Sequence, residues 1–237
     1  MQTQIPEIKG FIPNSLVDWD GKVSSVIFLA NCNFRCKFCS NKELVLEPAK
    51  LKNIQFEEVE KFLEKSTGFI DGIVISGGEP CIHSNLIGLL RKLRKFSFQI
   101  KIDTNGSYPE ILKQILNENL ADYIAMDIKT NFEEYASITN SDLNIEKIKE
   151  SIEIIKKFSD YEFRITMYPR ISEDNLMCVA RYLEQNNANK KFVLQQFRAE
   201  NCMDEETNNL KPYSEEQLKE MLKSVQNFFQ KVELRNA

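Results

Sequence analysis

The 237-residue sequence has one histidine, one tryptophan and no long apolar run. No segment approaches the roughly 20 apolar residues that span a bilayer. The first ten residues, MQTQIPEIKG, lack the apolar centre of a signal peptide. The sequence also lacks a Ser/His/Asp spacing, a Walker loop and an H-E-x-x-H motif, so a hydrolase or nucleotide kinase has little support. We therefore expect a cytoplasmic protein with no membrane partner.

A large excess of one charge is also missing. The net charge is -4 and the isoelectric point is about 5.4. A nucleic-acid partner would favour a basic face, so we expect none. The basic run at 91–95 falls late in a helical pattern, where cations suit the helix C-terminus, and we interpret it as a solvated face.

Strand-like and helix-like segments alternate along the chain. The expected strands are 22–30, 72–77, 98–103, 123–129, 161–169 and 191–198. The expected helices are 56–66, 85–96, one opened by Pro109, 145–158, 173–185 and 214–230. Six such pairs indicate parallel β/α units, two short of a closed barrel of about eight units. The fold class we expect is α/β, a partial (β/α)6 TIM-type barrel with parallel strands, with an open sheet as the alternative.

No linker, repeat or low-complexity segment divides the chain, which is long enough for one domain with a substantial core. We expect a single domain over 1–237. In this division 1–20 is an N-terminal extension, 22–200 is the β/α core, and 210–237 is a C-terminal helix.

Polar residues gather where the expected strands end. SGGEP follows the second strand, DTNG ends the third, MDIK lies in the fourth, Arg164 lies in the fifth, and QQFR ends the sixth. Ligands of parallel α/β folds bind at the carboxyl ends of strands. Charged groups within apolar strands are costly unless they are paired or face a polar cavity. The pattern predicts one site at a single edge of the sheet.

Three of the six cysteines, Cys32, Cys36 and Cys39, follow the first expected strand with the spacing C-x3-C-x2-C. Clustered cysteines in the cytoplasm more often bind metal or do redox chemistry than form disulfides. Three thiolates could bind zinc, with His83 as a remote fourth ligand, or three irons of a four-iron cluster whose fourth iron stays open. A loop with coincidental thiols is the third interpretation. The other three cysteines are far apart, and we interpret them as isolated thiols.

Gly77 and Gly78 directly follow a strand. Without a Cβ in the way, their backbone can approach a ligand closely, although a tight strand–helix turn would use the same residues. His83 lies near the start of a helix, and we interpret it as a surface or packing residue rather than a ligand.

Taken together, C-x3-C-x2-C with Phe38 before its last cysteine, and G-G-E-P after the second strand, resemble the radical S-adenosylmethionine (SAM) superfamily. The segments SLVDWDGK, KIDTNG, YIAMDIKT, YEFR and LQQFR extend the resemblance from Ser15 to Cys202. This wider set is similar to the activating enzymes of glycyl-radical enzymes, especially the short anaerobic ribonucleoside-triphosphate reductase activating protein. One departure is Ser40, because many activating enzymes have histidine there.

The resemblance implies a [4Fe-4S] cluster on Cys32, Cys36 and Cys39, with SAM on the open iron. Reductive cleavage of SAM would give a 5′-deoxyadenosyl radical that takes a hydrogen atom from a glycine of the partner enzyme. No insertion with further cysteine clusters is present, so flavodoxin or ferredoxin would supply the electron. The implied SAM-binding residues are Phe38, Ser40, Gly77, Gly78, Glu79, Asp103, Lys129 and Gln196. The residues implied to bind a monovalent cation are Asp103, Thr104 and Asp127.

Two other functions stay open at this point. One is a small-molecule enzyme of the same superfamily, resembling 7-carboxy-7-deazaguanine synthase, which Ser40 favours and the YIAMDIK and YEFR segments oppose. The other is a non-catalytic metal-binding module. An incomplete barrel would have an open side that a peptide loop could enter. This favours an enzyme with a protein substrate over both of these functions.

Overall fold

The computed structural model describes residues 4–235, and its strands form one eight-stranded sheet whose order follows the chain. The strands are β1 (Ile8–Ser15), β2 (Ser24–Leu29), β3 (Gly72–Gly77), β4 (Gln99–Thr104), β5 (Tyr123–Asp127), β6 (Tyr161–Met167), β7 (Lys191–Gln196) and β8 (Lys231–Arg235). Every neighbouring pair from β2 to β8 is parallel, and β1 is antiparallel to β2. Within residues 4–235, β1 and β8 do not pair, so the sheet stays open.

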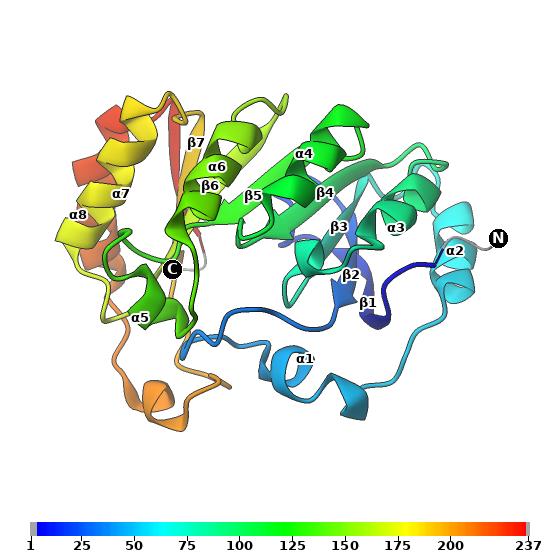
Figure 1. Cartoon of the computed structure of the whole chain (residues 1–237), viewed down its shortest axis with the longest axis horizontal. Coiled ribbons are helices and arrows are strands. Elements are labelled where there is room, and N and C mark those ends of the chain that lie inside the picture. The colour runs from blue at the N-terminus through cyan, green and yellow to red at the C-terminus, as the bar shows by residue number, and fades with distance from the viewer. Residues whose placement is uncertain (1–3, 236–237) are drawn as a thin grey trace.

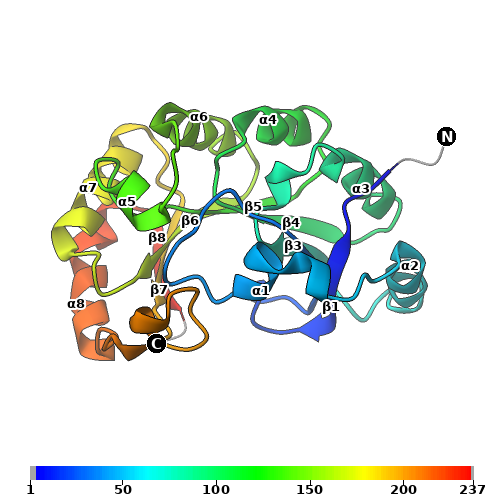
Figure 2. The same ribbon diagram turned by 60° about the horizontal axis from the view of Figure 1, so that its bottom comes forward.

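Helices connect the strands and cover one side of the sheet. The α-helices are α1 (Lys42–Leu46), α2 (Phe56–Lys65), α3 (Leu86–Leu93), α4 (Pro109–Asn117), α5 (Tyr135–Thr139), α6 (Ile145–Ile155), α7 (Glu173–Gln185) and α8 (Glu215–Val225). Four 3-10 helices, η1 (Pro48–Lys50), η2 (Pro80–Ile82), η3 (Glu205–Asn209) and η4 (Gln226–Phe228), complete the set. Figures 1 and 2 show α3, α4, α6 and α7 on the outer side of the curved sheet.

The predicted fold class is confirmed, and all six expected strands are present as β2 to β7. The structure adds two edge strands. Residues 8–15, expected to belong to an extension, form β1, and residues 231–235, expected to belong to a C-terminal helix region, form β8. β1 contains Gly10 and Pro13 and its pairing with β2 has two register shifts, so its sequence shows no regular strand pattern.

The main core lies between the sheet and the outer helices. α3 shows how a helix contributes to it, because Leu86, Leu89, Leu90 and Leu93 recur at helical spacing and are fully buried. The strands contribute their outward-pointing residues, for example Ile100 and Ile102 of β4. The outer helices therefore hold the sheet rigidly from one side and leave its other side for the site.

The inner face of the sheet is defined by residues that pair across neighbouring strands. Val26 pairs with Val74, and that row continues through Lys101 and Tyr123. In the same way, Ala125 pairs with Glu162 and Asp127 with Arg164. Paired residues share a face because side chains alternate along each strand. A small apolar cluster of Trp19, Val26, Val74, Tyr123 and Ala125 fills part of this face. Charged side chains take up much of the rest.

None of the helices in residues 4–235 combines the length and apolar character needed to cross a bilayer.

Candidate functional site

The three clustered cysteines lie on the loop that follows β2, which we call the cysteine loop (residues 30–41). In Figure 2 this loop, in blue, crosses the inner side of the sheet. Cys36 is buried, whereas Cys32 and Cys39 are partly exposed. The Phe34 backbone N–H and the Asn105 side-chain amide both donate to the Cys32 sulfur, at 3.4 and 3.7 Å. Donors of this kind stabilise a thiolate over a thiol.

Neighbouring segments hold the cysteine loop in place. Its first turn uses Asn31 in the left-handed region, at a φ of 64°. The Arg35 N–H donates to the Thr139 carbonyl at 2.8 Å, and the Met203 N–H donates to the Cys39 carbonyl at 2.9 Å. The loop therefore rests on α5 on one side and on the segment after β7 on the other. This second contact brings the buried Cys202, expected to be isolated, close to the cysteine loop.

Burial raises the pKa of Cys32 to about 12, and the charge of Glu79 adds to this effect. It also raises the pKa of Cys36 to about 11, although Lys129 acts in the opposite direction. Both thiols are protonated at neutral pH when no metal is bound. Metal loading must therefore displace these protons, which makes binding stronger as the pH rises.

The glycines at the end of β3 make room for the cysteine loop. A Cβ on Gly78 would lie 1.9 Å from the Asn31 carbonyl oxygen, and a Cβ on Gly77 would lie 2.2 Å from the Leu29 oxygen. Gly77 also has a φ of 122°, which favours glycine. The close backbone approach inferred from the sequence is therefore real, but its partner in the structure is the chain around Asn31.

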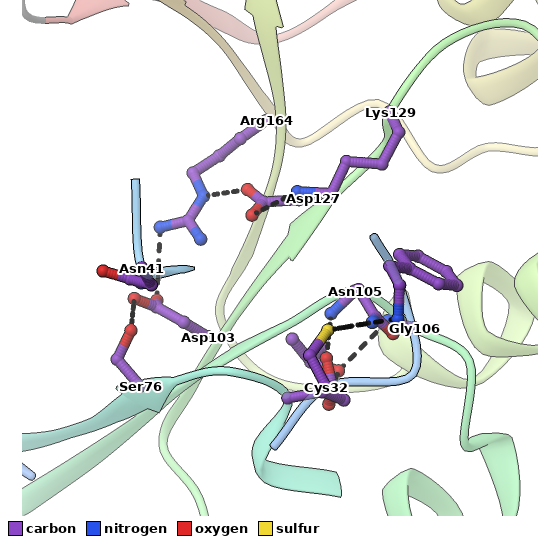
Figure 3. Close-up of polar contacts among 12 residues, drawn as sticks. Cys32, Asn41, Ser76, Asp103, Asn105, Gly106, Asp127, Lys129 and Arg164 are labelled. Atoms are coloured by element: carbon purple, nitrogen blue, oxygen red, sulfur yellow. Dashed lines mark hydrogen bonds and ion pairs between the residues drawn. The ribbon is translucent and has the colours of Figure 1, made fainter. Parts of the chain in front are cut away.

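Glu79 is fully buried between the same loop and β4. Its carboxylate accepts hydrogen bonds from the Cys81 N–H at 2.9 Å, the Thr104 hydroxyl at 2.7 Å and the Asn105 N–H at 2.5 Å. Burial raises its pKa, and these donors oppose the change. In this arrangement Glu79 fixes Asn105, whose side chain reaches the Cys32 sulfur (Figure 3). Its contacts are those of a residue that positions the loops.

On the inner face, five charged residues form what we call the Arg164 cluster: Lys101, Asp103, Asp127, Lys129 and Arg164. Arg164 donates through Nε to Asp127 at 2.7 Å and through Nη1 to Asp103 at 3.2 Å (Figure 3). Lys129 Nζ lies 3.1 Å from the other oxygen of Asp127. Lys101 Nζ lies 3.2 Å from Asp103 Oδ1, and the Ser76 hydroxyl donates to Asp103 Oδ2 at 3.1 Å. The cluster joins β4, β5 and β6, with Asp103 and Asp127 at the carboxyl ends of β4 and β5.

Among its own five residues the Arg164 cluster has three cations and two carboxylates, one excess positive charge, and Arg164 Nη1 also lies 4.0 Å from Oε1 of Glu162. Burial alone would raise the pKa of Asp127, but Arg164 and Lys129 lower it to about 2. Burial alone would lower the pKa of Lys129, but Asp127 raises it. Asp127 and Lys129 are therefore both ionised at neutral pH, and the cations of the cluster suit a negatively charged group.

The predicted cation ligands do not form one group. Thr104 is adjacent to Asp103 in β4, so its side chain points to the opposite face, where its hydroxyl donates to Glu79. Asp103 and Asp127 share an inner face but are joined through Arg164. A further cation within about 4 Å of that guanidinium would be repelled by about 4 kcal/mol at an effective dielectric constant of 20. The Thr104 hydroxyl is thus not on the face that carries Asp103 and Asp127.

Aromatic rings line the other end of the cysteine loop. Phe38 stacks on Tyr168, with ring centroids 4.9 Å apart, and Tyr168 meets Phe197 edge to face at 5.5 Å. The Tyr168 hydroxyl is buried without a hydrogen-bond partner in the described part of the chain. Ser40, next to Cys39, is exposed. The sequence indicated Phe38 but not the two rings that support it.

Two further sequence interpretations can be compared with the structure. Gln196 is on the same face of β7 as Phe192 and Leu194, which are in the outer core, and its amide donates to the Tyr213 carbonyl at 3.0 Å. At this end of β7 the side chain on the inner face is that of Gln195, which pairs with Thr166. His83 Nε2 contacts the Ala30 carbonyl at 2.8 Å, which agrees with a packing role.

Sequence reasoning missed several inner-face residues. Arg164 was visible as a charge within an apolar strand, but its partners were not. Lys101 and Glu162 gave the same signal and were not assigned to the site. Asn105 belongs to the DTNG segment, yet only the fold shows that it reaches Cys32.

The sequence profile of the Radical SAM superfamily matches residues 26–183, which include the cysteine loop and the Arg164 cluster. The chain belongs to the radical SAM superfamily. It is therefore an enzyme of this class, and the alternative of a non-catalytic metal-binding module is wrong. The superfamily uses a [4Fe-4S] cluster and SAM.

Curated relatives agree with this family. A protein of Methanocaldococcus jannaschii, provisionally named a glycyl-radical enzyme activating enzyme, is 31% identical over 235 residues, which cover 96% of this chain and 95% of that protein. A second, similarly named protein of that organism is 30% identical and covers 64% of this chain and 59% of its own length. A 7-carboxy-7-deazaguanine synthase of Halobacterium salinarum is 28% identical over 87 residues, 37% of this chain and 33% of that protein.

Solved structures confirm the fold. Streptococcus suis SuiB bound to its precursor peptide SuiA superposes with a TM-score of 0.67 at 13% identity, over 88% of this chain and 48% of SuiB. A domain of a pyruvate-formate lyase-activating enzyme from Bacteroides vulgatus superposes with a TM-score of 0.56 at 19% identity, over 69% of this chain and 98% of that domain.

Proposed function

We propose that this chain is the activating enzyme of a glycyl-radical enzyme, and that its partner is an anaerobic ribonucleoside-triphosphate reductase. The match to the Methanocaldococcus jannaschii protein along almost the whole of both chains is the observation that carries the proposal. The choice of partner depends on the resemblance of the sequence to the short activating proteins of that reductase.

The residues of the cysteine loop fit a four-iron cluster. Cys32, Cys36 and Cys39 supply three soft ligands from one short loop, and two N–H groups are directed at the Cys32 sulfur. Within residues 4–235 these sulfurs are not grouped around one point as the ligands of a single ion would be. A four-iron cluster does not need such grouping, because each thiolate binds a different iron. When bound on Cys32, Cys36 and Cys39, the cluster would supply the one-electron chemistry that cleaves SAM and so makes hydrogen abstraction from glycine possible.

The polypeptide contributes binding, orientation and exclusion of water. Lys129 carries the positive charge that would attract the methionine carboxylate of SAM, and Arg164 holds Asp127, the partner of Lys129, in place. The Gly77–Gly78 backbone would border the methionine amino group and Phe38 the adenine. Gln195, on the inner face at the end of β7, would take the role that the resemblance implied for Gln196. Glu79 acts through Asn105 on Cys32. Ser40 is exposed beside this site, and we propose it as a contact at the edge of SAM.

The open sheet supports a protein substrate. Because β1 and β8 do not pair within residues 4–235, the barrel has an unclosed side through which a peptide loop can enter. A flavodoxin or ferredoxin would donate the electron, since the described chain places its clustered cysteines in a single loop. A small-molecule reaction is less well supported, because the similarity to 7-carboxy-7-deazaguanine synthase covers 37% of this chain.

The decisive experiment mixes the anaerobically loaded full chain with the reductase, SAM and a low-potential reductant. We expect a glycyl electron paramagnetic resonance signal on the reductase and release of 5′-deoxyadenosine. Cys36→Ala should abolish both and lose the bound iron. Cys178→Ala is the matched control, because Cys178 is exposed and distant in sequence from the cysteine loop.

Formation of 5′-deoxyadenosine without a glycyl signal on any glycyl-radical enzyme would contradict the proposed partner class. No 5′-deoxyadenosine from the loaded chain would contradict the assignment of the site itself.

A further inference from the structure

Within the Arg164 cluster, the guanidinium contacts both carboxylates in a way that the family resemblance did not imply. Arg164 extends from β6 across β5 and contacts a carboxylate on each of two neighbouring strands, Asp127 on β5 and Asp103 on β4 (Figure 3). Its side chain is only 9% exposed. A guanidinium keeps its charge at all accessible pH values and presents its donors in a fixed plane. It is therefore a permanent positive charge between two carboxylates.

Each carboxylate oxygen of this pair already has a partner. Asp103 Oδ1 contacts Lys101 and Arg164, and its Oδ2 accepts from the Ser76 hydroxyl. Asp127 Oδ1 accepts from Arg164, and its Oδ2 lies 3.1 Å from Lys129 Nζ. A Na⁺ or K⁺ ion at this position would have to displace at least one of these cations, and the cluster already carries an excess of positive charge.

We propose that the Arg164 guanidinium takes the place of a monovalent cation between Asp103 and Asp127, so that this chain neither binds nor requires Na⁺ or K⁺ there. Arg164 is thus a positioning residue. It holds the two carboxylates apart, and Asp127 in turn orients Lys129. Removal of the guanidinium would leave two carboxylates with two lysines and one unoccupied position between them. That position would suit a small monovalent cation.

The inference rests on the proposed function only where it treats this position as part of a SAM-binding site. Its first test therefore uses the full chain without cluster or SAM. Sodium-23 line broadening is measured during titration with NaCl, with choline chloride keeping the ionic strength constant. Wild type should show no saturable broadening. Arg164→Met should show saturable broadening that KCl competes away, and Arg164→Met/Asp127→Asn should lose it because one carboxylate charge is gone. Arg164→Lys keeps a cation at the position and should behave as wild type.

The second test uses the loaded enzyme. SAM cleavage by wild type should be the same in NaCl, KCl and choline chloride. In Arg164→Met, cleavage should fall in choline chloride and recover in NaCl or KCl, by about tenfold if the ion restores about 1.4 kcal/mol of the lost interaction. A purely structural role for Arg164 would not make activity depend on the identity of the cation.

Saturable Na⁺ binding by wild type that Asp127→Asn abolishes would overturn the proposal. So would a folded Arg164→Met variant that binds no more Na⁺ than wild type. If Arg164→Met does not fold, the comparison of wild type with Asp127→Asn decides alone. A chain that fails to cleave SAM at all still gives the sodium-23 result, which separates this inference from the proposed function.

Discussion

Two ion clusters lie on the inner face of the same sheet, two residues apart on β6, and they differ in charge and exposure. The Glu162 cluster consists of Tyr123, Glu162, Lys191, Glu233 and Arg235. Glu162 accepts from Tyr123 at 2.9 Å and from both terminal nitrogens of Arg235 at 2.9 and 3.1 Å, and Lys191 lies 3.2 Å away. Lys191 also pairs with Glu233 at 2.7 Å, so among these residues two cations balance two carboxylates. Longer ion pairs lead out of the cluster, from Lys191 to Asp20 at 3.6 Å and from Glu162 to Arg164 at 4.0 Å.

The balanced cluster is complete without a ligand. Glu162 is 2% exposed, whereas Asp103 and Asp127 of the Arg164 cluster are 16% and 26% exposed. The Arg164 cluster also keeps one positive charge that no carboxylate within it balances. A buried ion cluster can therefore stabilise the fold when it is neutral and closed, and can bind a ligand when it is charged and partly open. A cavity of about 480 Å³ lies beside Glu162 and is lined also by Trp19, by Lys191 and by Lys101 of the Arg164 cluster. It lies at the amino ends of the strands, away from the cysteine loop.

The largest effect should follow from removing the central carboxylate of the balanced cluster. Glu162→Ala leaves Arg235 and Lys191 buried with one carboxylate fewer, and breaking a buried ion pair on one side costs about 3–5 kcal/mol. We expect this loss in the free energy of unfolding, measured by urea denaturation followed by circular dichroism. Glu233→Ala, at a more exposed carboxylate, should cost less than half as much. Equal losses for the two variants would show that the closed cluster is not what stabilises the sheet.

The next largest effect concerns the cysteine loop, which lies beside the Arg164 cluster only. In Gly78→Ala the new Cβ would meet the Asn31 carbonyl at 1.9 Å, so the loop must move, at a cost of about 1–3 kcal/mol. The bound iron per chain after anaerobic loading should fall. Gly68→Ala is the matched control, because Gly68 has a φ of 81° but no atom within 4 Å of a new Cβ. A loss of iron in the control as well would point to general destabilisation.

The contribution of the Arg164 cluster to the stability of the fold should depend on pH in the acid range. The pKa of Asp127 is about 2 in the folded state and 3.8 in the unfolded chain, so the ionised carboxylate stabilises the fold above about pH 4. That contribution, about 2 kcal/mol, is lost as the pH falls from 4 to 2. Urea denaturation at several pH values should show a shallower dependence for Asp127→Asn than for wild type over this range. An unchanged slope would mean that Asp127 is not held by Arg164 and Lys129 in solution.

The smallest effects should come from removing single hydroxyl donors, one that is bonded to a carboxylate of each cluster. Tyr123→Phe removes a hydrogen bond to the buried Glu162 and should cost about 1–2 kcal/mol. Ser76→Ala removes a bond to the partly exposed Asp103, which keeps Lys101 and Arg164, and should cost about 0.5–1 kcal/mol. Thermal denaturation of both variants measures the difference. A larger cost for Ser76→Ala would reverse the order of the two clusters.

The sequence predicted the six central strands because they are apolar segments separated by helical patterns. It did not predict β1 or β8, since edge strands have weaker patterns and β8 alternates charged with apolar residues over only five positions. The position of the cysteines after β2 also followed from the sequence. The strand periodicity of two, applied to Asp103, could have placed Thr104 on the opposite face. No local pattern could have shown that Arg164 bridges two strands or that Cys202 lies near the cysteine loop, because these contacts depend on how the whole sheet curves.

Trp19 gives the Glu162 side of the sheet an optical signal of its own. It is the single tryptophan of the sequence, is 5% exposed, and lies against Gly72 and Tyr123. Its fluorescence emission therefore reports the packing of this region alone, with no other indole to obscure it. A red shift that precedes the loss of ellipticity would reveal that the amino ends of the strands open before the helices unwind.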